Sequence, residues 1–276
     1  MQKRARRYAE KIDSFGGVLD PARSARSYAL RLFQPSAALA PFVEHYWLVD
    51  WDLPPGASYE AEVLPRPNIN LALMPDRGWI TGITTGLYTY TCRGRGGVFG
   101  GGFRPGGFRP FFGRPVAELV DSTIEAETIF PAMTEAARRT VLAGADPQVR
   151  IARVEDMLLA SGLPPQDEAI ALAVRCVETA RDDRSITSVA SLARRCAMSQ
   201  RSLQKLFQDH VGAGPKWIIR LYRLVDAAAR ATAGTPPNWT EVALDLGYAD
   251  QSHFTNDFRR VIGRSPGSYA REANAE

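Results

Sequence analysis

Two clusters of polar side chains near the C-terminal end have the chemistry needed to read DNA. Arginine and lysine suit the O6 and N7 atoms of guanine, whereas glutamine and asparagine suit N6 and N7 of adenine. The candidates for contacts with base edges are Gln200, Arg201, Gln204 and Lys205 in the first cluster, and Gln251, Ser252, His253, Thr255 and Asn256 in the second. Arg259, Arg260 and Arg220 are candidates for contacts with phosphate.

No comparable pattern predicts catalysis or a metal centre. The three histidines, His45, His210 and His253, lack metal-ligand spacing, and no nucleophile lies in a recognisable motif with a base. The three cysteines are far apart, which is typical of a reducing cytoplasm. No apolar run is long enough to cross a bilayer. We therefore expect a cytoplasmic protein without catalytic residues, bound metal or cofactor.

An internal repeat places both clusters on the second helix of a helix-turn-helix unit. A shift of 51 residues superimposes Leu203 on Phe254, Phe207 on Phe258 and Pro215 on Pro266. Each copy is predicted to be a helix, a tight turn and a second helix, the arrangement that reads the major groove. The predicted N-caps are Ser188 and Ser199 in the first copy, and Asn238, with Glu241 in a capping box, and Asp250 in the second.

The segment between the two copies predicts a connector helix over residues 215–233, ended by Gly234 to Pro237. Such a helix spans roughly 28 Å. Successive major-groove segments on one side of B-DNA are roughly 34 Å apart. We therefore expect the connector to place both second helices in adjacent grooves of double-stranded DNA.

Residues 185–272 resemble the DNA-binding domain of AraC/XylS-type transcription regulators. The second copy, from Ala243 through Gly247 to Pro266, carries the family's signature. Two positions depart from it, because Ala197 replaces the usual turn glycine and Asn256 replaces a frequent arginine. We expect Ala197 to cost about 1 kcal/mol of backbone strain. The resemblance implies a transcription regulator that binds DNA as a monomer or homodimer and acts on RNA polymerase.

Charge and composition divide the chain into parts. Residues 184–271 hold 13 basic and 6 acidic residues, a net charge of +7, whereas the remainder holds 21 basic and 24 acidic residues, a net charge of −3. The basic excess therefore lies where DNA would bind. The predicted parts are an N-terminal extension (1–35), a β-rich domain (36–135), a helical linker region (136–184) and the DNA-binding domain (185–272).

The N-terminal half predicts a β-barrel, so the expected fold class is multidomain α and β. Short strand-like segments from Phe42 to Thr91 are separated by proline and glycine. Residues 36–135 resemble an uncharacterised domain that often precedes AraC-type modules. The resemblance lies in His45-Tyr46-Trp47, Pro67-Asn68-Ile69-Asn70 and Phe103 to Phe108. By analogy it implies a cupin-like, metal-free barrel that senses a small-molecule effector or dimerises.

Two questions stay open at this stage. The glycine-rich stretch from Gly94 to Pro115 is either an anion- or ligand-binding loop or a set of tight turns at a barrel edge. The N-terminal barrel is either a sensor or an enzyme fused to a DNA-binding module, and a purely architectural DNA binder is a third alternative. An open apolar pocket with a few polar groups favours sensing, and a filled barrel favours the architectural role.

Overall fold

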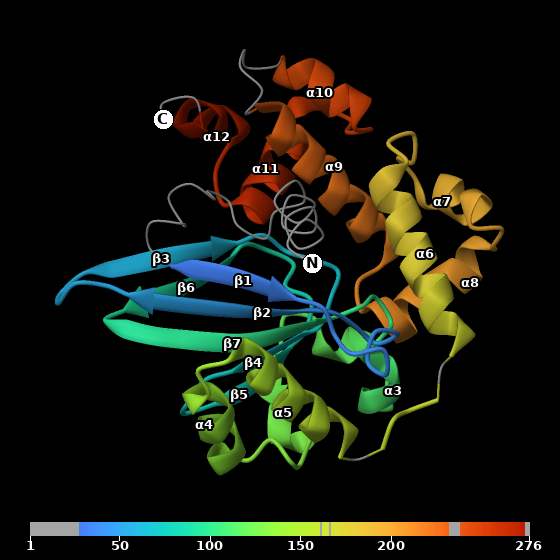
Figure 1. The fold of residues 1–276 in the computed structure, drawn as a ribbon. Coiled ribbons are helices and arrows are strands. Elements are labelled where there is room, and N and C mark those ends of the chain that lie inside the picture. The colour runs from blue at the N-terminus through green and yellow to red at the C-terminus, as the bar shows by residue number, and fades with distance from the viewer. Residues whose placement is uncertain (1–27, 161, 166, 232–237, 274–276) are drawn as a thin grey trace.

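A computed structural model describes residues 28–160, 162–165, 167–231 and 238–273 (Figure 1). Strands occupy the N-terminal half, and helices occupy the C-terminal half. The strands are β1 (Ala29–Phe33), β2 (Val43–Asp52), β3 (Ser58–Val63), β4 (Asn70–Leu73), β5 (Gly78–Thr81), β6 (Tyr88–Arg93), β7 (Arg95–Phe103) and β8 (Thr123–Glu125). This division confirms the predicted fold class.

The strands form two open antiparallel sheets instead of a closed barrel. Six strands pair in the order β1-β2-β7-β4-β5-β8, and β3 pairs with β6 in a separate ribbon. The larger sheet begins at Ala29, whereas the predicted domain begins at residue 36. Residues 1–27 of the predicted extension lie outside the described residues.

The six-stranded sheet has two different faces because successive side chains alternate. On one face Tyr46 and Leu48 join Phe99 in the largest hydrophobic core. This face is covered by α3 (Arg109–Phe112), α4 (Glu135–Ala143) and α5 (Pro147–Leu159), with short 3₁₀ turns η1 (Val116–Leu119) and η2 (Ala126–Thr128). Helices α4 and α5 belong to the helical linker region predicted for residues 136–184, and both pack into this core.

Residues 95–103 of the glycine-rich stretch form the central strand β7. Gly100 lies opposite Trp47 of β2, and Gly96 lies opposite Trp51. A Cβ atom on Gly100 would lie 1.9 Å from Cε2 of Trp47, and one on Gly96 would lie 2.4 Å from Cζ2 of Trp51. The glycines therefore leave room for indole rings to lie across the strand. Residues 95–103 are neither a ligand-binding loop nor turns at an edge.

The C-terminal half contains both predicted helix-turn-helix units. Its helices are α6 (Glu168–Asp182), α7 (Val189–Arg195), α8 (Gln200–Leu206), the π-helical segment η3 (Phe207–Val211), α9 (Pro215–Ala231), α10 (Trp239–Asp245), α11 (Gln251–Ile262) and α12 (Pro266–Ala273). Helix α9 runs between the α6–α8 group and the α10–α12 group (Figure 1). The predicted stop signal from Gly234 to Pro237 lies outside the described residues.

The predicted N-caps are confirmed, with one difference in detail. The side chains of Ser188, Ser199, Asn238 and Asp250 each accept a hydrogen bond from a backbone N–H in the first helical turn. Glu241, however, accepts from the side-chain amide of Asn238 at 3.0 Å. A capping box requires the side chain three residues on to accept from the N-cap backbone N–H, so the predicted capping box is incomplete.

Both helix-turn-helix units pack against the N-terminal half. In the first unit, Gly212 approaches Val116 of η1, and Ile83 joins the core of the unit. In the second, Leu64 belongs to the hydrophobic cluster of α9–α11, with Leu87 packed against it. Glu62 of β3 also forms an ion pair with Arg264. The two halves are thus joined by packing as well as by the chain.

Candidate DNA interface and effector cavity

The turn of each helix-turn-helix unit has the same backbone geometry. Ala197 in the first turn has a φ of 53°, and Gly247 in the second has a φ of 77°. The N–H of Met198 donates to the Ala193 carbonyl at 2.9 Å, and the N–H of Tyr248 donates to the Ala243 carbonyl at 2.9 Å. The repeat found in the sequence is therefore a structural repeat, and Ala197 occupies the left-handed region that favours glycine.

Helix α8 presents its predicted DNA-contacting side chains to solvent. Leu203 and Leu206 are buried in the first unit and fix the orientation of the helix. The exposed residues of the opposite face are Gln200, Arg201, Gln204 and Lys205. Their side chains combine guanine-type and adenine-type donors and acceptors on one accessible helix face.

On helix α11 the predicted DNA-contacting side chains differ in their exposure and in their existing hydrogen bonds. The exposed candidates are Gln251, Ser252, His253, Asn256, Arg259 and Arg260, and Thr255 is half-buried. Gln251 accepts a hydrogen bond from the Thr240 hydroxyl at 2.9 Å. The Arg260 side chain is 55% exposed and lies 3.8 Å from Asp257, so it is available to an external anion.

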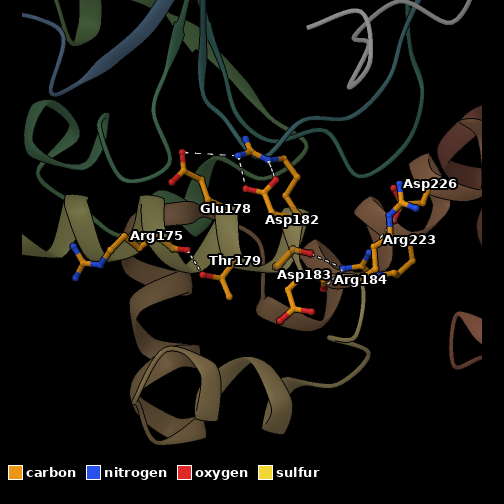
Figure 2. Close-up of polar contacts among 10 residues, drawn as sticks. Arg175, Glu178, Thr179, Asp182, Asp183, Arg184, Arg223 and Asp226 are labelled. Carbon is orange, nitrogen blue, oxygen red and sulfur yellow. Dashed lines mark hydrogen bonds and ion pairs between the residues drawn. The ribbon is translucent and has the colours of Figure 1, made fainter. Parts of the chain in front are cut away.

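A buried arginine, which the sequence did not single out, fixes the connector helix. Arg223 of α9 is 2% exposed. Its guanidinium donates to the carbonyls of Ala180 and Asp183 at 2.7 and 2.8 Å and to the Asp226 carboxylate at 2.8 Å. Figure 2 shows this side chain beside the C-terminal end of α6. Arg223 therefore anchors α9 to α6, which precedes the first unit.

An apolar cavity of about 260 Å³ lies between the two sheets. Its walls include Trp47 and Trp51 of β2, Trp79 of β5 and Tyr88 and Tyr90 of β6. The polar residues that line it include His45, Arg66, Asn68 and Asn70. Such a lining, mostly apolar with a few polar groups, is typical of small-molecule sites.

Burial controls the ionisation of His45, which is 3% exposed. Loss of hydration, aided by the positive charge of Arg66, lowers the pKa of His45 from 6.5 to about 4. The imidazole is therefore neutral at pH 7.

Within the described ranges, no group of three or more His, Cys, Asp or Glu side chains could hold a metal ion. None of the described helices is both long enough and apolar enough to span a membrane.

One segment separates this cavity from a second cleft. The cleft, of about 290 Å³, lies between the N-terminal half and helices α6 and α9. Arg66 and Asn68 line both spaces, and Leu221, Tyr222 and Val225 of α9 line the cleft. Leu64, which also lines the apolar cavity, packs with Leu221 and Leu224. Residues 64–68, the partition segment, thus touch the cavity on one side and the connector helix on the other.

Comparisons with known proteins match two different families to the N-terminal and C-terminal parts of the chain. Residues 192–272 match a family described as a helix-turn-helix domain, and residues 31–125 match a domain of unknown function, DUF6597. A putative AraC-like transcription regulator of Streptomyces lividans is 32% identical over 103 residues, which cover 37% of this chain and 33% of that protein. The XylDLEGF operon transcriptional activator of Pseudomonas putida is 33% identical over 91 residues, covering 32% of this chain and 28% of the activator.

The chain spans about a third of the length of these curated relatives. Among solved structures, a probable AraC family regulator of Rhodopseudomonas palustris is 24% identical, with a TM-score of 0.34, and covers 39% of this chain and 98% of its own. A likeness at that score adds nothing to the assignment. The sequence matches suffice: this chain carries an AraC-type helix-turn-helix domain behind a domain of the DUF6597 family.

Proposed function

We propose that this protein is a sequence-specific DNA-binding transcription regulator that reads two adjacent major-groove segments. The repeated unit carries the proposal, because each copy presents polar side chains on the exposed face of its second helix. The proposed base contacts are Gln200, Arg201, Gln204 and Lys205 of α8 and Gln251, Ser252, His253, Thr255 and Asn256 of α11, with phosphate contacts from Arg259 and Arg260.

We also propose that the N-terminal domain senses a small effector and is not an enzyme. The apolar cavity supports sensing, and the partition segment supplies a direct physical path from the cavity to α9. A ligand that repositions residues 64–68 would change how α9 holds the two units, which is the differential contact that coupling requires. Either a monomer or a homodimer that acts on RNA polymerase in the cytoplasm fits the proposal.

Selection of bound sequences from random DNA with the purified full chain tests the first proposal. We expect one enriched site of about 15–20 base pairs, whose affinity falls steeply with salt. The Arg201→Ala variant should lose about 1–3 kcal/mol of specific binding and relax base preference at one position. Arg260→Ala should weaken binding to all sequences alike.

Arg175→Ala is the matched control, because Arg175 is an exposed arginine on α6, outside both units. It removes the same charge and should leave base preference and affinity nearly unchanged. Unaltered base preferences in Arg201→Ala would remove Arg201 from the reading surface. Absence of any enriched sequence would contradict the proposed function as a whole.

A further inference from the structure

The floor of the apolar cavity is a set of aromatic rings that lie flat on glycines. Trp47 and Trp51 of β2 lie opposite Gly100 and Gly96 of β7, and a Cβ on either glycine would occupy the ring positions. Because the rings lie along the sheet, their faces turn toward the open space between the sheets. Flat ring faces favour a flat partner, since offset stacking adds to the apolar burial.

The polar groups of the cavity gather at one end, over Gly102. Gly102 pairs with His45 on one side and Asn70 on the other, and a Cβ placed on it would lie 2.9 Å from Nδ2 of Asn68. Asn68 is 5% exposed, and its Oδ1 is buried without a hydrogen-bond partner in the described part of the chain. A buried acceptor without a partner is costly. A ligand hydroxyl or N–H at this end would supply the missing donor.

The charges near the polar end balance one another. The Arg66 guanidinium lies 3.9 Å from the Glu44 carboxylate. His45 is neutral at pH 7 because burial lowers its pKa to about 4. A carboxylate ligand would therefore enter a mostly apolar cavity where the nearest cation already has an anionic neighbour, at a large cost in hydration. The site favours an uncharged ligand.

We propose that this cavity binds an uncharged, planar aromatic compound of about two fused rings that carries one hydroxyl or N–H group. The size follows from the volume, because a cavity of about 150 Å³ holds benzene and this one measures about 260 Å³. The inference deepens the proposed function and rests on it for the role of the ligand as an effector.

Isothermal titration calorimetry of the full chain with three probes tests the ligand class. The probes are 2-naphthol, naphthalene and 2-naphthoate, which share a ring system and differ in the polar group. We expect 2-naphthol to bind one to one with a Kd on the order of 10 µM. Naphthalene should bind about tenfold more weakly, the worth of one net hydrogen bond. Naphthoate should bind at least about tenfold more weakly because its charge must be buried.

Two variants and one control separate the parts of the site. Ala72 of β4 lies between Gly100 and Trp79, so Ala72→Leu should fill the cavity and abolish binding of all three probes. Thr89→Leu, on the exposed face of β6, adds a similar side chain outside the cavity and should bind like the unmodified chain. Asn68→Leu conserves volume and should bind 2-naphthol and naphthalene equally, while keeping the cooperative unfolding of the parent.

Several outcomes would overturn the proposal: tightest binding by naphthoate, unchanged binding in Ala72→Leu, or no binding of any probe up to about 1 mM. The DNA selection described above is a separate readout. Failure of the probes with intact DNA binding refutes the ligand class alone. Probe binding without any enriched DNA sequence refutes the regulator function and leaves the ligand class in place.

Discussion

Replacing Arg223 by methionine should destabilise the C-terminal half more than any surface change. Methionine keeps most of the length and the apolar stem but removes the guanidinium. The side chain is 2% exposed, so water cannot replace the lost donors. The carbonyls of Ala180 and Asp183 and the carboxylate of Asp226, which is 12% exposed, would lose the hydrogen bonds from Arg223. The Asp183 carbonyl would keep a hydrogen bond from the Ile186 N–H at 3.1 Å.

The expected loss in the free energy of unfolding follows from the polar groups that lose Arg223 as a partner. Breaking a buried ion pair by removing one partner costs about 3–5 kcal/mol. Arg184 remains 3.6 Å from Asp226, but its side chain is 70% exposed and offers little compensation. We therefore expect the free energy of unfolding to fall by about 4 kcal/mol. Urea unfolding followed by far-UV circular dichroism, which reports the helices, measures it.

A double variant makes the test specific. Arg223→Met combined with Asp226→Leu removes the charge left behind, so it should recover about 1–2 kcal/mol of the loss. A loss below about 1 kcal/mol in the single variant would show that the hydrogen bonds of Arg223 matter little. A double variant no more stable than the single one would show that the uncompensated Asp226 charge is not the cause.

Three further predictions follow from backbone and burial. Ala197→Gly should raise the free energy of unfolding by up to about 1 kcal/mol in urea titrations, because φ is 53° at this position. An unchanged free energy of unfolding would refute the backbone strain assigned to Ala197. Gly100→Ala should lower it by about 1–3 kcal/mol and shift tryptophan emission, because Trp47 must move, whereas Gly214→Ala, with open space around it, should not. His45 has a pKa of about 4 in the folded protein and 6.5 ordinarily, so the stability it contributes is complete above pH 6.5 and lost as the pH falls toward 4. Over this pH range the His45→Gln variant should lose about 3 kcal/mol less of its free energy of unfolding than the parent does. Identical profiles of unfolding free energy against pH for the two proteins would contradict the depressed pKa.

The C-terminal half was predictable because local signals and the repeat agree. Caps at Ser188, Ser199 and Asp250 place the helices, and the shift of 51 residues aligns the second helices of the two copies. Arg223 was missed because a single arginine in an amphipathic helix gives no sign of burial. Its importance depends on carbonyls about 40 residues earlier in the chain, at the end of α6.

The N-terminal half was predictable in class but not in topology. The aromatic and branched residues of β2 indicated strand structure, yet nothing local shows that β2 pairs with β7 and that β3 pairs only with β6. The structural role of the β7 glycines depends on which side chains of the neighbouring strand β2 lie opposite them. Without the register, Gly96 and Gly100 resembled turn residues, although they lie beneath the indole rings that form the floor of the cavity.

The two-stranded ribbon of β3 and β6 ties the cavity to the second helix-turn-helix unit. A ribbon of two strands is only marginally stable on its own, so its amide hydrogens should exchange with solvent faster than those of β2 and β7. Its C-terminal end on β3 holds Arg264 through Glu62, and the N–H of Leu87, just before β6, donates to the Arg260 carbonyl at 3.4 Å. Local opening of the ribbon therefore also weakens the contacts that hold the end of α11 in place. A molecule bound beneath the ribbon slows both exchange processes together, so protection of β3 and β6 and protection of the end of α11 should rise as one cooperative unit.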